Sequence, residues 1–365
     1  MASLQASTLW HQEKRHWFSI AFRWHSSVIP AILPRVILCV LFGTLIAGLY
    51  ALGLPVSLPI ESGVIPSLVL SLLLVFRTNT AYERFWEGRK QWGMLVNTVR
   101  NLSRQIWVVI EENNPEDRAT KIGILRLLVA FAVATKLHLR AEPANDELKE
   151  LMPKEWHEKL RMMNNPPLEV AFWIGDYLQQ EYNRDRANIY QLSEMFKLLD
   201  KMVDVLGACE RILKTPIPLA YSIHLKQLLF IYCLSLPFQL VGEFNWATGF
   251  LVGLIGFTLF GIEEIGIEIE NPFGYDPNDL PLDAICRTMQ MNIEDLISLA
   301  PCVRQWKAKS TNQKAQKSPQ NLDRNGTEKL QKSSSSSSEN ETEKMTFMTE
   351  KTPDRSPHPS RNGTN

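Results

Sequence analysis

Four apolar runs constrain this chain more than any other feature of its sequence. Val36–Leu54 contains no charged residue and would span roughly 28 Å as a helix, close to the hydrocarbon thickness of about 30 Å. The other runs are Val64–Phe76, Leu225–Val241 and Trp246–Ile262. The sequence therefore predicts an all-helical membrane protein with four transmembrane helices.

The second run changes character abruptly where it ends. No charge appears from Val64 to Phe76, which is thirteen residues and short for a span that faces lipid. Arg77, Glu83 and Arg84 then open a segment dense in charged and aromatic residues. We therefore expect one helix that crosses the membrane and continues into a domain exposed to water.

The segment 91–215 has the pattern of soluble helices, with apolar residues recurring at three- and four-residue spacing. Ile122–Leu139 is its most apolar part and competes as a transmembrane helix. However, Arg126 and Lys136 leave only nine uncharged residues between them. We predict that this stretch is a buried helix of a soluble domain.

Basic residues are absent from two short loops, one between the first and second runs and one between the third and fourth. The first loop has Glu61 as its only charged residue, and the second has only Glu243. The positive-inside rule then places both termini and the middle domain on the cytosolic or stromal side. We predict a multi-pass protein of the cell (inner) membrane or the thylakoid membrane. The zero net charge gives no sign of nucleic-acid binding.

No residue set for catalysis is apparent in the sequence. It lacks a nucleotide-binding loop, an HExxH helix and a nucleophile elbow. Its five cysteines are widely spaced and include no CxxC pair, which argues against a disulfide framework or a zinc site. We therefore predict that the protein is not an enzyme and needs no cofactor.

Leu68, Leu72 and Phe76 stand four residues apart and would form one apolar stripe along the second helix. On a single helix, such a stripe is most simply explained by packing against protein or lipid. If several copies surround a symmetry axis, the same stripe becomes a hydrophobic constriction, which can gate ions by dewetting.

Three ordered motifs make the sequence distinctive. They are Phe76–Arg89 (FRTNTAYERFWEGR), Ile217–Tyr221 (IPLAY) and Glu270–Asp283 (ENPFGYDPNDLPLD). Together they resemble the bestrophin family, and most closely its bacterial, cyanobacterial and plant thylakoid members. The resemblance covers about residues 10–300.

This resemblance implies a homopentameric ion channel with four transmembrane helices and a large cytosolic helical domain in each subunit. Matching Arg84–Trp86 to the family's Arg-aromatic-Trp motif places the hydrophobic neck of the pore at Leu68, Leu72 and Phe76. The family's lower aperture is set by an apolar residue before a proline, which is Ile217 here. The implied partners are further copies of the chain, membrane lipid, and chloride or other monovalent ions.

Calcium is the one cofactor that the resemblance raises. In the animal members, the Asn-Pro-Phe-Gly motif precedes a run of acids that forms a calcium clasp. Here only Asp276 and Asp279 follow it, and Pro277 separates them. Calcium prefers six to eight oxygen ligands, several of them from carboxylates. These two residues are therefore weak calcium candidates, and turn formation explains them equally well.

The sign of the conducted ion stays open in the sequence, because a neck of Leu, Leu and Phe carries no charge. We favour anions such as chloride and bicarbonate, with Arg77 as a candidate charge on the ion path. Arg77 could instead pair with Glu83 or Glu87. The alternatives are a cation-selective channel, as in a bacterial relative, and a membrane-anchored scaffold or sensor with a Ser-rich tail.

These interpretations divide the chain into six segments. We predict an N-terminal interfacial or cytosolic helix (1–35), transmembrane helices 1 and 2 with the neck (36–90), a cytosolic helical domain (91–215), transmembrane helices 3 and 4 (216–265), a cytosolic motif and last helix (266–306), and a disordered tail (307–365).

Overall fold

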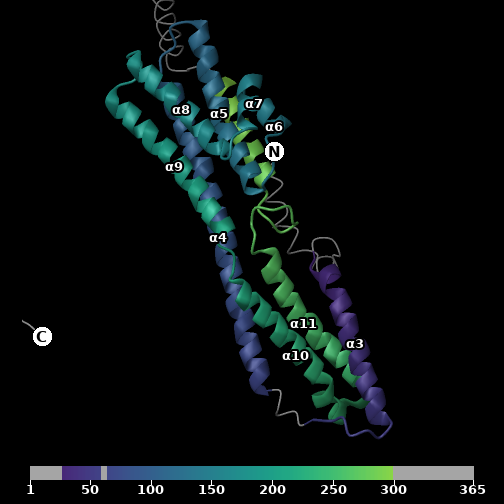
Figure 1. Ribbon diagram of the computed structural model, residues 1–365. Helices are drawn as coiled ribbons and strands as arrows, with labels where there is room; N and C mark the ends of the chain where they lie inside the picture. Colours follow the sequence, from purple (N-terminus) through teal and green to yellow (C-terminus); the bar gives the residue numbers. More distant parts are fainter. Residues whose placement is uncertain (1–26, 59–63, 299–365) are drawn as a thin grey trace, which may run out of the picture. The chain divides into compact units, whose positions relative to one another are not determined.

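The computed structural model describes residues 27–58 and 64–298, and these ranges contain helices and no strands. The α-helices are α3 (Ile29–Ala51), α4 (Val64–Val109), α5 (Pro115–Leu139), α6 (Asp146–Lys149), α7 (Lys154–Leu160), α8 (Pro166–Asn183), α9 (Ile189–Lys214), α10 (Leu219–Phe244), α11 (Thr248–Glu268) and α12 (Leu282–Ser298) (Figure 1). The predictions for 1–26, for the end of the last helix and for the tail lie outside the described residues.

Among the described residues, four helical stretches are long and apolar enough to cross a membrane. One of them, Leu219–Glu268, contains both α10 and α11, which are joined by the 3₁₀ turn Asn245–Ala247 and pack against each other. Another is α5, whose most apolar window is 78% buried inside the protein, against 22–33% for the others. A helix already buried in protein has no face for lipid. The transmembrane helices are therefore α3, the first part of α4, α10 and α11.

Helix α4 runs without interruption for 46 residues, which corresponds to about 69 Å at the helical rise. This length exceeds what a bilayer requires, as the abrupt change after Phe76 predicts. Helices α10 and α11 pack against its N-terminal half, and α3 lies on their far side (Figure 1). Helices α5 and α9 pack against its C-terminal half, and α8 packs on these two. One rigid element thus connects the membrane region to the soluble core.

The pair α3 and α11 has the most extensive contact of any two described helices, and glycines allow it. A Cβ atom on Gly249 would lie 2.3 Å from Thr44 Oγ1 and 3.1 Å from the carbonyl oxygen of Val40. One on Gly253 would lie 2.4 Å from Val40 Cγ2. Small residues therefore allow the close packing of this pair.

Replacing Gly249 with alanine is expected to separate α3 from α11 and to lower the thermal stability of the purified protein. The new methyl group would collide with Thr44 and with the backbone, which cannot move aside cheaply. Gly256→Ala is the matched control on the same helix, because its Cβ would meet only ordinary contacts at 3.7 Å. Equal melting temperatures for the two variants would contradict this packing account.

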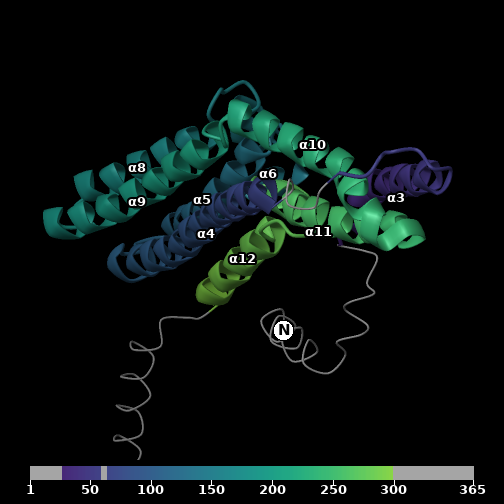
Figure 2. The same ribbon diagram turned by 90° about the horizontal axis from the view of Figure 1, so that it is seen from below.

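The soluble core gathers apolar faces from α4, α5, α8, α9 and α12, and Leu148 of α6 and Leu160 of α7 join it. Asn114 caps α5 by accepting the N–H of Asp117 at 2.8 Å, so the helix begins at Pro115. Helices α8 and α9 follow each other closely in the sequence. They are separated at Arg184–Asn188, where Asp185 adopts a φ of +58°. Figure 2 shows α8 and α9 side by side, with α12 near α4.

The segment 271–281 fastens the end of α11 to this core. Phe273 is fully buried and lies against Gly88 of α4, where a Cβ atom would come within 3.1 Å of its ring. Arg140 donates from Nε to the carbonyl of Phe273 at 3.0 Å and from Nη2 to that of Gly274 at 3.0 Å. The motif Glu270–Asp283 therefore has a clear structural role.

Candidate functional site

The predicted neck residues lie on an exposed face of α4. The exposed fractions are 66% for Leu68 and 55% for both Leu72 and Phe76. The opposite face is buried, and its Leu70 and Leu74 pack against α10. Packing within the chain therefore does not account for the stripe, and its apolar side chains need a partner outside the subunit.

Phe76 and Ile217 line one hollow, although they are far apart in the sequence. Its volume is about 230 Å³, and its walls are Phe76, Arg77, Thr80, Ile217, Pro218 and Tyr221. Tyr221 holds the two sides together, because its hydroxyl donates to the carbonyl of Leu73 at 2.7 Å. The hollow thus joins the last residue of the predicted neck to the residue of the predicted aperture.

Arg77 is almost fully buried, with 3% of its side chain exposed. Its Nη1 lies 3.6 Å from Glu263 Oε1, and its Nη2 lies 3.8 Å from Glu270 Oε2. Arg77 therefore pairs with carboxylates, as the alternative predicts, but these are Glu263 and Glu270 and not Glu83 or Glu87. Glu83 and Glu87 lie six and ten positions after Arg77, whereas side chains that contact each other on one helix lie three or four positions apart.

Glu263 holds a second arginine as well. Arg35 Nη1 of α3 lies 3.7 Å from Glu263 Oε2 and 3.0 Å from Glu264 Oε2. Both distances from Glu263 exceed a hydrogen bond. Glu263 Oε1 and the Nε and Nη1 atoms of Arg77 have no hydrogen-bond partner among the residues that the structure describes. Three transmembrane helices, α3, α4 and α11, therefore meet at one buried carboxylate.

Glu270 links the other side of this cluster to the aperture. Its Oε1 accepts the backbone N–H of Ile217 at 3.1 Å, and its carbonyl oxygen accepts from Arg84 Nε at 3.1 Å. Arg84 also donates to the carbonyls of Ile212 and Thr215 at the end of α9. The arginine of the RFW motif thus fixes the chain just before Ile217.

Asp276 and Asp279 lie together in one turn. The N–H of Asp276 donates to Asp279 Oδ2 at 2.8 Å, and the N–H of Asp279 donates to the carbonyl of Asp276 at 2.9 Å. Burial raises the pKa of Asp279 to about 6. The hydrogen bond from the N–H of Asp276 and the positive charge of Arg140 oppose this rise, whereas the negative charges of Asp276 and Glu268 add to it. Among the described residues, no group of three or more His, Cys, Asp or Glu could hold a metal.

This turn should become more stable as the pH falls from 7 to 5. Asp279 binds its proton more tightly in the folded than in the unfolded protein, so its protonation stabilises the fold. This contribution is fully present below the unfolded pKa of about 3.9. That contribution is lost as the pH rises through the folded value of about 6. Hydrogen exchange of residues 271–283, corrected for the intrinsic rate, should therefore slow at pH 5. Asp279→Asn should remove the difference, and a pH effect that persists in this variant would refute the assignment to Asp279.

Glu263 and Glu270 were missed as site residues by sequence reasoning. In the sequence, Glu270 stands out only as the first residue of the third motif, and no motif includes Glu263. The available signal was the position of Glu263 directly after the apolar run Trp246–Ile262. An ionisable side chain at the end of such a run implies a partner inside the protein.

Comparison with known proteins agrees with these features. The model of the bacterial and fungal bestrophin proteins matches residues 9–295. A protein of Nostoc sp., named a voltage-dependent anion channel-forming protein, is 66% identical over 291 residues, which cover 80% of this chain and 95% of that protein. An Escherichia coli protein of the same description is 33% identical over 285 residues, covering 77% of this chain and 91% of that one.

The solved structures give the same answer for the fold. The crystal structure of a bacterial bestrophin homologue from Klebsiella pneumoniae superimposes with a TM-score of 0.68 at 30% identity, covering 74% of this chain and 100% of that one. The family match spans the neck helix, the aperture and the Glu270–Asp283 motif. The chain therefore belongs to the bestrophin family, in its bacterial and fungal group.

Proposed function

We propose that this protein is an ion channel that conducts monovalent anions, chloride and bicarbonate among them, through a homopentameric pore. The observation that carries the proposal is the exposed stripe Leu68, Leu72 and Phe76 on a helix whose other face is buried. Five copies around an axis would turn this stripe into three apolar rings, a geometry that gates by dewetting. Passive conduction needs no catalytic residues.

Two features support an anion as the conducted ion. Helix α10 begins at Leu219, next to the hollow, with no acidic residue in its first turn. The N-terminal end of a helix dipole carries a partial positive charge. Arg77 lines the same hollow, although Glu263 and Glu270 offset much of its charge. The relatives from Nostoc and Escherichia coli are named anion channel-forming proteins.

The proposed orientation follows from the loops. The segment that joins α3 to α4 and the turn that joins α10 to α11 contain no Lys or Arg, which is typical of the outer side of a membrane. We propose that both termini and the α5–α9 domain lie in the cytosol or stroma. The proposal includes no cofactor, and Asp276 and Asp279 stay weak candidates for calcium.

A reversal potential under a salt gradient tests the sign of the ion. The purified full-length protein would be fused into a planar bilayer with a tenfold potassium chloride gradient. The reversal potential should approach the equilibrium potential of chloride. A value near that of potassium would favour the cation-selective alternative, and no current from a pure pentamer would contradict the channel itself.

A further inference from the structure

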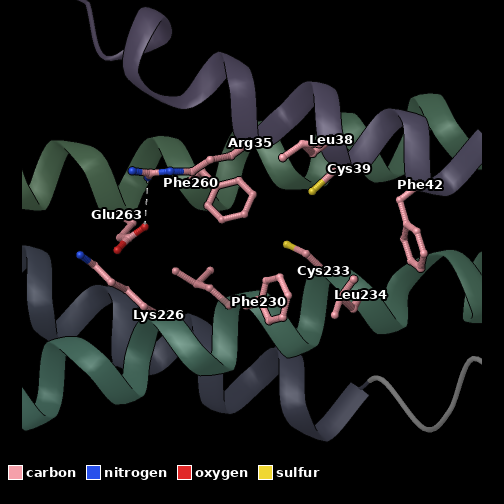
Figure 3. Close-up of a pocket in the computed structure, with 11 residues that line it drawn as sticks. Arg35, Leu38, Cys39, Phe42, Lys226, Phe230, Cys233, Leu234, Phe260 and Glu263 are labelled. Carbon is pink, nitrogen blue, oxygen red and sulfur yellow. Dashed lines mark ion pairs between the residues drawn. The ribbon is translucent and has the colours of Figure 1, made fainter.

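A cavity of about 460 Å³ lies between α3, α10 and α11, outside the proposed ion path. Its volume falls in the range of roughly 300–1,000 Å³ that is typical of ligand sites. Figure 3 shows Arg35, Lys226 and Glu263 at one end and Phe42 and Leu234 at the other. The cavity is thus polar at one end and apolar along the rest.

The apolar part of this cavity opens toward lipid. Leu38 and Phe230 on its rim are 66% and 62% exposed, and both belong to transmembrane helices. Cys39 and Cys233 face each other across its middle, and both are free thiols. An apolar groove in this position would accommodate a hydrocarbon chain, because no polar group there requires water.

The polar end exposes more positive than negative charge. Glu263 is shared between Arg77 and Arg35, and Arg35 has Glu264 as a closer partner at 3.0 Å. The Glu263 side chain is only 3% exposed and presents little negative surface. Lys226 is exposed, and no carboxylate of the described residues forms an ion pair with it. Arg35 remains 45% exposed beside it.

Lys226 is also unusual in the sequence, because it is a charged residue inside the predicted third span, Leu225–Val241. A lysine near the end of a span extends its ammonium group to the headgroup region instead of leaving it in hydrocarbon. Under the orientation proposed above, this end faces the cytosolic leaflet. That leaflet contains anionic lipids, and basic pockets between transmembrane helices on this side bind their headgroups.

We propose that this cavity binds an anionic phospholipid, with the headgroup phosphate between Lys226 and Arg35 and an acyl chain along α3 and α10. The site lies apart from the stripe of α4, so lipid binding does not depend on conduction. Charge complementarity at one end and an apolar groove at the other together select this ligand over a soluble anion or a neutral lipid.

Native mass spectrometry of the detergent-solubilised assembly tests the proposal. The probes are phosphatidylglycerol and phosphatidylcholine with identical acyl chains. The wild type should prefer phosphatidylglycerol, and Lys226→Gln should lower this preference about five-fold, the value of one basic residue near an anionic headgroup. Lys226→Arg should retain it. An unchanged preference in Lys226→Gln would overturn the proposal.

A second pair of variants tests the apolar part. Cys39→Phe would fill the middle of the cavity and should reduce the binding of both lipids, whereas Ile37→Phe on the same helix, outside the cavity lining, should not. Full lipid binding by Cys39→Phe would show that lipid sits elsewhere or that another subunit covers the groove, and would overturn the proposal. If Cys39→Phe fails to assemble, the lipid preference of Lys226→Gln still tests the proposal.

Discussion

Leu72→Ala is expected to raise the current of the reconstituted protein about tenfold or more, because it weakens the dewetting barrier of the neck. Truncating leucine to alanine removes about 2 kcal/mol of apolar transfer free energy per side chain. A barrier lower by about 1.4 kcal/mol already gives a tenfold higher rate. Leu68→Ala and Phe76→Ala should act in the same direction. Single-channel recording at symmetrical salt measures the effect as open probability and conductance.

Leu45→Ala is the matched control for these neck variants. Leu45 is 58% exposed, close to the 55% of Leu72, but it lies on α3. Its truncation removes the same surface and should leave the current unchanged. Equal effects of Leu45→Ala and Leu72→Ala would indicate a general loss of helix packing. Unchanged current in all three neck variants would contradict a pore lined by α4.

Sequence reasoning succeeded where local pattern determines structure. The change from apolar to charged residues after Phe76 predicted that α4 outruns the bilayer. The pair Arg126 and Lys136 predicted that α5 belongs to the soluble core, where it is buried. In each case, the chemistry of neighbouring residues allows only one environment.

It failed where contacts join distant segments. The partners of Arg77 come from α11 and the residues after it, and the periodicity of α4 contains no information about them. The break at Asp185 between α8 and α9 has no signal in the apolar pattern, which continues on both sides of it. The predicted roles of Leu68, Leu72, Phe76 and Ile217 depend on neighbouring subunits, so they stay predictions.

Glu263→Gln is expected to lower the stability of the protein by about 3–5 kcal/mol, the cost of leaving one partner of a buried ion pair uncompensated. Arg77 is 3% exposed and would keep only Glu270, at 3.8 Å. The melting temperature should fall by roughly 10 °C, using the scale for large domains. Glu264→Gln is the neighbouring control, because its partner Arg35 is 45% exposed and a pair with an exposed partner contributes about 0–1 kcal/mol.

The double variant Arg77→Met with Glu263→Met separates the structural role of Arg77 from a role on the ion path. Apolar replacement of a whole buried pair is often neutral or stabilising, so the double variant should regain most of the stability that Glu263→Gln loses. If Arg77 serves only to bind Glu263, the double variant should have the same reversal potential as the wild type under a chloride gradient. If the charge of Arg77 attracts anions into the hollow beside Phe76, the stable double variant should show a reversal potential shifted toward zero. Stability that stays as low as in Glu263→Gln would contradict the buried-pair account, because the unpaired charge would then not be the cause of the loss.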